Sequence, residues 1–171
     1  MKKTILMILF VLLWTVSIAA AAPLKVGDKA TDFKVTDTLK KEWSLTAPEW
    51  KGKVIMFNAM PLDEIKTNLG ISEVIAKDNE IDKVNKYVGA AIFSKPPKMY
   101  LAQLRNAQRK FKKVYLLDYD DVVLKQWGLT PGVSTMIVLD KDRICRYIHP
   151  GKVPNDKIPE LIKLIKTLQA K

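Results

Sequence analysis

The stretch KGKVIMFNAMPLD, residues 51–63, decides the fold. Lys51–Lys53 predicts a turn, and the apolar run Val54–Phe57 predicts a strand that is apolar on both faces. Such strands are typical of a parallel sheet buried between helical layers. The run stops at Asn58–Pro61, and a helix is expected to begin near Asp63. Ligands and chemistry concentrate at this kind of junction in open α/β sheets, because strand carboxyl ends and helix amino ends converge there.

Residues 1–22 have the pattern of a secretory signal peptide. Lys2 and Lys3 precede an apolar run, Ile5–Ile18, which four alanines separate from Pro23. We expect cleavage within the alanines, leaving residues 23–171 as one periplasmic or secreted domain. The alternative is an uncleaved membrane anchor, since the apolar segment approaches the roughly 18 residues that a spanning helix needs.

Composition limits the chemistry. The chain has one cysteine, Cys145, and one histidine, His149, so an intramolecular disulfide and a multi-histidine metal site are both excluded. The formal net charge is +11, of which Lys2 and Lys3 contribute two. A basic exported protein can meet anionic lipid, a polyanion or an acidic partner, but a generally solvated basic surface explains the charge equally simply.

The apolar periodicity predicts a hairpin, two βαβ units, a second hairpin and a final helix. The expected strands are Phe33–Val35, Trp43–Leu45, Val54–Phe57, Tyr87–Phe93, Val114–Leu117, Thr135–Leu139 and Ile144–Ile148. One imperfect helix or two short ones are expected over residues 63–81, and further helices after Pro96, over 120–127 and over 156–168. Consecutive βαβ units imply parallel pairing with right-handed crossovers.

Several short motifs follow one another in an order and at spacings that are found together in a known protein family: Val26-Gly27-Asp28, Asp32-Phe33, Lys51-Gly52-Lys53, Gly132-Val133-Ser134-Thr135 and Val138-Leu139-Asp140-Lys141-Asp142. With these residues the mature chain resembles the redoxin family, which includes thiol-specific antioxidant proteins and exported thiol-disulfide oxidoreductases. The resemblance implies a three-layer α/β thioredoxin-like fold, with a central mixed sheet, an N-terminal hairpin extension and flanking helices. Within the family, the chain is most similar to small exported proteins without the cysteine pair, the YtfJ-like group.

Two elements of redoxin chemistry are missing. The family places a reactive cysteine at the strand-to-helix junction, where a thiolate forms; here that position reads Asn58, Ala59, Met60 and Pro61. The family also places a cis-proline before the hairpin strand, where this chain has Ser134. A cis bond before a non-proline residue costs about 2.5–4 kcal/mol, so we expect a trans peptide. Met60 and Pro61 are expected to fill the space of the missing thiol, or to contact a partner's extended segment.

The remaining candidates for chemistry have simpler explanations. Cys145, Tyr147 and His149 alternate along a predicted strand, so they are expected to share one face, where an imidazole can activate a thiol; a structural cysteine is the alternative. A cluster of aspartates, Asp118, Asp120 and Asp121, suggests either a cation site or helix capping. The basic run 105–113 suggests a surface that binds acidic lipid or an acidic partner. Phe111 and Tyr115 are expected to point into the core, which argues against nucleic-acid binding.

The leading hypothesis is therefore a non-catalytic binding or assembly module of the cell envelope, with no cofactor or metal and with an envelope protein as its partner. Membrane association is expected only if the N-terminal segment is retained. The alternative is a divergent thiol oxidoreductase or antioxidant protein that uses Cys145 in trans with another thiol protein.

Overall fold

The computed structural model describes residues 22–171. The predicted signal peptide lies outside the described residues, apart from Ala22. In the part that is described, no helix combines the length and the apolarity needed to cross a membrane.

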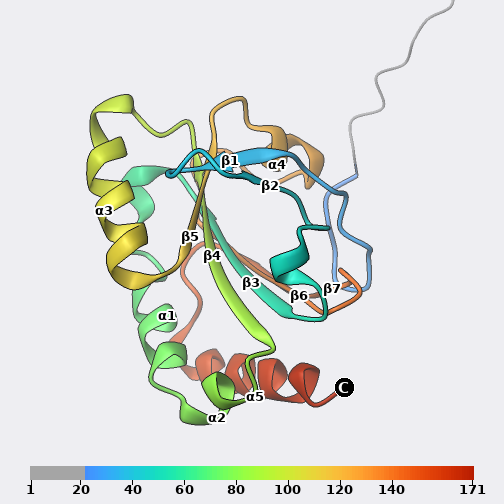
Figure 1. Cartoon of the computed structure of the whole chain (residues 1–171). Coiled ribbons are helices and arrows are strands. Elements are labelled where there is room, and N and C mark those ends of the chain that lie inside the picture. The colour runs from blue at the N-terminus through green and yellow to red at the C-terminus, as the bar shows by residue number, and fades with distance from the viewer. Residues whose placement is uncertain (1–21) are drawn as a thin grey trace, which may run out of the picture.

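Seven strands form one mixed sheet in the order β2-β1-β5-β4-β3-β6-β7 (Figure 1). The strands are β1 (Val35–Asp37), β2 (Glu42–Trp43), β3 (Val54–Met60), β4 (Tyr87–Ser94), β5 (Val114–Asp118), β6 (Thr135–Leu139) and β7 (Cys145–Pro150). Strands β3, β4 and β5 are parallel, whereas β1–β2 and β6–β7 are antiparallel hairpins. Both predicted hairpins and the parallel centre are confirmed.

The helices are α1 (Leu69–Ala76), α2 (Asn79–Lys83), α3 (Leu101–Phe111), α4 (Val122–Gln126) and α5 (Ile158–Gln169). Four short 3₁₀ turns cover Pro48–Trp50, Leu62–Glu64, Lys98–Tyr100 and Asn155–Lys157. The segment 63–81 therefore contains two short helices, which was one of the two expected forms. Helices α1, α2, α3 and α5 lie on one face of the sheet and α4 on the other (Figure 1).

Alternation along β3 divides the core between the two faces of the sheet. Ile55, Phe57 and Ala59 point to the face that carries α4 and the N-terminal segment, where four further aromatic side chains gather: Phe33, Trp43, Trp50 and Trp127. Val54 and Met56 point to the other face, under α1, α2 and α5. Farther along that second face, Met60 packs with Phe93, Leu104 and Leu117 beneath α3. Two separate apolar clusters thus share the face that carries four helices.

Two expectations about local structure were wrong. Strand β3 does not end at Phe57 but continues to Met60, because β4 pairs with it as far as Met60, β6 pairs with it as far as Ala59, and all seven residues are buried. Phe111 does not reach the core: it is 56% exposed at the last turn of α3, whereas Leu104 provides the buried contact. Tyr115, in contrast, packs edge-on against Phe93, with ring centroids 5.5 Å apart.

Candidate functional site

The residues at the redoxin active-site position lie inside the sheet. Asn58, Ala59 and Met60 are the last three residues of β3, and Pro61 begins the loop that follows. Asn58 pairs with Met136 and Ala59 with Thr135, which places Ser134 beside the end of β3. Only a 3₁₀ turn follows Pro61, and the first α-helix begins at Leu69. The expected junction of strand end and helix amino end is therefore replaced by a longer strand and an irregular segment.

Asn58 and Ser134 are joined by a buried hydrogen bond. The Ser134 hydroxyl donates to Oδ1 of Asn58 at 2.9 Å and accepts from Nδ2 of Asn68 at 3.1 Å. The side chain of Asn68 also donates to the carbonyl of Gly151 at 3.1 Å and accepts from the amide of Val153 at 3.0 Å. No described peptide bond is cis, so the expected trans peptide before Ser134 is confirmed. This network satisfies the polar groups that the buried site contains.

Asn68, which no sequence pattern had indicated, joins three parts of the chain at this site. The residue precedes α1, and its side chain is 1% exposed. Through Asn68, the start of α1 is held against Ser134 and the segment after β7. A single asparagine between two helical patterns carries no signal of such long-range contacts, so the sequence alone could not have identified it.

Next to this network, a groove with a volume of about 820 Å³ opens at the carboxyl ends of β3 and β4. Its lining includes Pro61 and Leu62 after β3, Tyr100, Leu104 and Ala107 of the α3 segment, and Pro131–Gly132. This is the position where parallel α/β sheets bind ligands. The volume falls within the range of about 300–1,000 Å³ that is typical of ligand pockets. No cysteine or histidine lines the groove.

The polar part of the groove includes an ion pair between Lys95 and Asp121, together with Asp63 and Gln103. Ser94 adds a hydrogen bond of 2.6 Å to the same carboxylate. Burial alone would raise the pKa of Asp121, but the hydrogen bonds from Lys95 and Ser94 bring that pKa below its usual value. The groove therefore combines apolar walls with an ion pair that can orient a ligand, and no thiol or imidazole is among its lining groups.

Cys145 does not share a face with Tyr147 and His149, contrary to expectation. The register between β6 and β7 shifts by one residue, so that Leu139 pairs with Cys145 while Val138 pairs with Tyr147. This bulge turns Cys145 into the aromatic-rich core and Tyr147 to the opposite face. Tyr147 and His149 remain together, with ring centroids 6.4 Å apart. The proposed imidazole partner of the thiol is thus absent.

The environment of Cys145 also opposes thiol chemistry. Its side chain is fully buried, and burial raises its pKa to about 11. Its strand partner Leu139 pairs with Ile55, near the start of β3, whereas Asn58 pairs with Met136 three residues along β6. The cysteine therefore lies away from the groove and on the other side of the sheet from Asn58.

The aspartate cluster is explained by helix capping. Asp118 accepts hydrogen bonds from the amides of Val122, Val123 and Leu124 at the start of α4, with distances of 2.6–3.3 Å. Asp121 is paired with Lys95. In the described part of the chain, no three acidic, histidine or cysteine side chains converge in a way that could hold a metal ion.

The comparisons with known proteins agree with this architecture. A family profile described as "Bacterial protein of unknown function (YtfJ_HI0045)" matches residues 72–168. No curated protein sequence matches the chain.

Among solved structures, the chain is similar to a peroxiredoxin-like protein from Aquifex aeolicus, with a TM-score of 0.63, 15% identity and coverage of 85% of this chain and 90% of that one. Peroxidoxin BcpB from Mycobacterium tuberculosis aligns with a TM-score of 0.64, 19% identity and coverage of 84% and 97%. The exposed lipoprotein thioredoxin of Streptococcus pneumoniae aligns with a TM-score of 0.57, 20% identity and coverage of 78% and 99%. At these identities the comparisons establish the thioredoxin-like α/β fold.

Proposed function

We propose that this chain, which belongs to the YtfJ_HI0045 family of bacterial proteins of unknown function, is an exported, non-catalytic binding module of the cell envelope. Because the function of the family is unknown, the proposal rests on the site of this chain. The observation that carries the proposal is the hydrogen bond between Asn58 and Ser134. A buried polar pair stands where redox relatives need a thiolate and a cis-proline. The side chains of this pair are hydrogen-bonded, and neither carries a thiol.

The groove beside this pair is the proposed binding surface. Its apolar walls, formed by Leu62, Leu104 and Pro131 among others, suit an extended segment of a partner protein that inserts an apolar side chain. Lys95 and Asp121 are available to form hydrogen bonds with the partner's backbone or an ion pair with an opposite charge on the partner. Tyr100, which is 37% exposed, offers an aromatic anchor of the kind that is enriched at interfaces.

Photo-cross-linking inside cells tests this proposal. A photoreactive amino acid at Tyr100 reports on the groove, and the same amino acid at Lys34, an exposed residue beside β1, serves as the control. We expect one envelope protein to be captured from position 100 but not from position 34. The capture should disappear in Ala107→Trp, which fills the groove. Equal capture from both positions, or capture that survives the filled groove, would contradict the proposal.

The proposed export depends on the signal pattern of residues 1–22. Mass spectrometry of the protein recovered from the cell envelope should find a mature N-terminus at Ala21 or Ala22, because Pro23 directly after the cut is unfavourable. A retained N-terminus would instead support the membrane-tethered form that the apolar segment also allows.

The rival enzymatic function can be tested directly. Insulin reduction and peroxide consumption should stay at background for the wild-type protein, because Cys145 is buried and its thiol holds its proton. Activity above background that is lost in both Cys145→Ser and Cys145→Ala would show that the protein is a thiol enzyme and would contradict the proposed binding function.

A further inference from the structure

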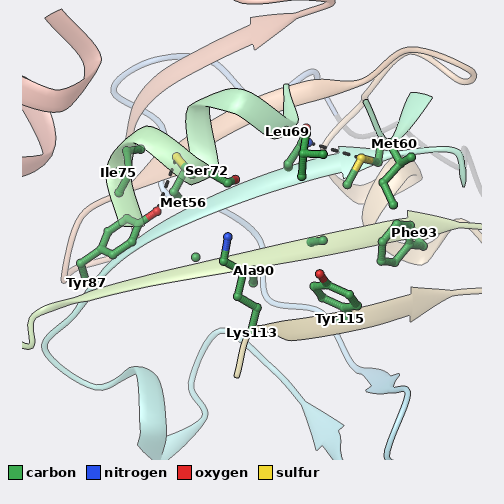
Figure 2. Close-up of a pocket in the computed structure, with 14 residues that line it drawn as sticks. Met56, Met60, Leu69, Ser72, Ile75, Tyr87, Ala90, Phe93, Lys113 and Tyr115 are labelled. Carbon is green, nitrogen blue, oxygen red and sulfur yellow. Dashed lines mark hydrogen bonds between the residues drawn. The ribbon is translucent and has the colours of Figure 1, made fainter. Parts of the chain in front are cut away.

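A second cavity, of about 110 Å³, lies between α1 and the sheet, on the face that carries α3 and α5 (Figure 2). Its floor is formed where β4 carries Gly89 and Ala91 between the larger Tyr87 and Phe93. The two apolar clusters of this face, one under α1 and α5 and one under α3, meet on either side of that gap. The cavity thus results from two residues with little or no side chain in the middle of β4.

Apolar side chains form most of the cavity wall: Met56, Met60, Ile65, Leu69, Ile75 and Phe93. Five polar side chains join them. Asn58 and Tyr87 already make hydrogen bonds to Ser134, Met60 and Met56, and the other three are Ser72 of α1, Lys113 just before β5 and Tyr115 of β5. Figure 2 shows the Lys113 ammonium group pointing across β4 toward α1. Within the described residues, no hydrogen bond or ion pair occupies the hydroxyl groups of Ser72 and Tyr115 or the ammonium group of Lys113. Three side chains therefore face the cavity with hydrogen-bond donors that no described group accepts.

The charged side chain that lines the cavity, Lys113, favours an anion. Lys113 ends a basic run that includes Arg109, Lys110 and Lys112, and none of these four side chains lies within ion-pair distance of a described carboxylate. Burial lowers the pKa of Lys113, and Glu73 on α1 partly opposes that effect. A bound anion would raise the pKa of Lys113, as Glu73 does, and its effect would be stronger at closer range.

We propose that this cavity binds a small aliphatic carboxylate, whose apolar body occupies the space above Ala91, beside the Tyr87 ring that covers Gly89, and whose carboxylate contacts Lys113, Ser72 and Tyr115. The size follows from the volume: a cavity of about 150 Å³ holds benzene, so this one accommodates a ligand of about four to six non-hydrogen atoms. An apolar wall with a few converging donors is the usual composition of a small-molecule site. The cavity adjoins the groove, with which it shares Ile65, but its ligand is tested independently of the proposed partner.

NMR titration of the ¹⁵N-labelled protein, residues 23–171, tests this site. Isobutyrate is the probe, isobutanol keeps the apolar body without the charge, and acetate keeps the charge with almost no body. We expect isobutyrate to bind with a dissociation constant in the millimolar range, as suits so small a ligand. Its chemical-shift changes should concentrate at Gly89, Ala91, Ser72 and Tyr115. Acetate and isobutanol should each bind at least about tenfold more weakly.

Three variants assign the contacts. Lys113→Met should weaken isobutyrate binding at least about tenfold and leave isobutanol binding unchanged, because it removes the charge and keeps the side-chain length. Ala91→Leu, which fills the cavity, should abolish binding of both. Lys110→Met is the matched control, since it removes an exposed charge of the same run outside the cavity. Thermal unfolding of each variant verifies folding, and Lys113→Met alone carries the test if Ala91→Leu does not fold.

Several outcomes would overturn the proposal. These are equal affinity for acetate and isobutyrate, shifts confined to exposed lysines outside the cavity, wild-type isobutyrate affinity in Lys113→Met, or the absence of any saturable shift at tens of millimolar probe.

Discussion

Ser134 donates a hydrogen bond of 2.9 Å to Asn58, and its hydroxyl simultaneously accepts one from Asn68, so a single oxygen joins three distant parts of the chain. In redox relatives the corresponding positions carry the reactive thiol and the proline beside it. Here the same space holds a closed hydrogen-bond network that also ties down the segment after β7. The arrangement explains how the fold keeps its shape at this point without the residues that usually occupy it.

Removal of the Asn68 amide should destabilise the protein strongly. Asn68→Ala leaves the amide of Val153 and the carbonyl of Gly151 without their side-chain partner, in a site where Asn68 is 1% exposed. Each buried polar group that loses its partner costs about 1–3 kcal/mol, so we expect the free energy of unfolding to fall by about 2–4 kcal/mol. Urea denaturation followed by circular dichroism measures this change.

The matched control is Asn106→Ala, which removes an asparagine from the exposed side of α3. Its effect should stay within about 0.5 kcal/mol, as for other surface substitutions. Equal losses in the two variants would mean that the network around Ser134 contributes nothing particular to stability.

Cys145 should react slowly in the native protein. With burial raising its pKa to about 11, only about one thiol in a thousand is ionised at pH 8, and the thiolate is the reactive form. We expect the labelling rate with a neutral maleimide to rise about tenfold per pH unit between pH 7 and 10, and labelling to be fast in denaturant. Rapid native labelling that levels off near pH 8.5 would show an ordinary, accessible thiol.

The same thiol should make stability fall in alkali. The native pKa lies above the value of about 8.5 for an unfolded cysteine, so the native state binds more protons between these two values. The free energy of unfolding therefore decreases as the pH rises from about 8.5 toward 11. Cys145→Ala should make this decrease shallower between about pH 8.5 and 10, below the range in which the partly buried tyrosines, whose pKa values are also raised, contribute. Urea denaturation at several pH values measures the slope, and an unchanged slope in the variant would contradict the assignment.

The sequence contained most of the fold and little of the site. Strands and helices followed from apolar periodicity, and the parallel centre followed from two βαβ units. The β-bulge beside Cys145 could not be predicted, because one extra residue in a short strand leaves no periodic signal, yet it reverses the face on which Cys145 lies. Asn58 was expected in a loop because the strand was taken to end where its apolar run ended, but pairing on both sides carries the strand through it.

Arg143 should be poorly replaced by lysine. Its guanidinium donates to the carbonyls of Trp50 at 2.7 Å, Leu45 at 2.8 Å and Lys53 at 3.1 Å, and so connects the β6–β7 turn to the segment before β3. Lysine cannot donate in this forked geometry. We expect Arg143→Lys to lower the free energy of unfolding by about 1–3 kcal/mol.

Arg146→Lys provides the comparison for Arg143, because Arg146 is a partly exposed arginine of the same hairpin that pairs with Asp140 at 2.7 Å. A pair with that exposure contributes at most about 1 kcal/mol, so this variant should unfold close to the wild type. Indistinguishable urea midpoints for the two variants would remove the connecting role assigned to Arg143.

A last pair of variants tests which side of α3 faces the core. Leu104 is 5% exposed and packs against the cluster around Met60 and Phe93, whereas Phe111 is 56% exposed, with the Lys110 ammonium group 5.5 Å from its ring. Leu104→Ala should cost about 2–5 kcal/mol, because it opens a cavity in a packed core. Phe111→Ala should cost less than about 1 kcal/mol, although it removes the larger side chain. Urea denaturation of the two variants decides the matter: a larger loss for Phe111→Ala would mean that the helix turns its aromatic residue inward, as the sequence first suggested.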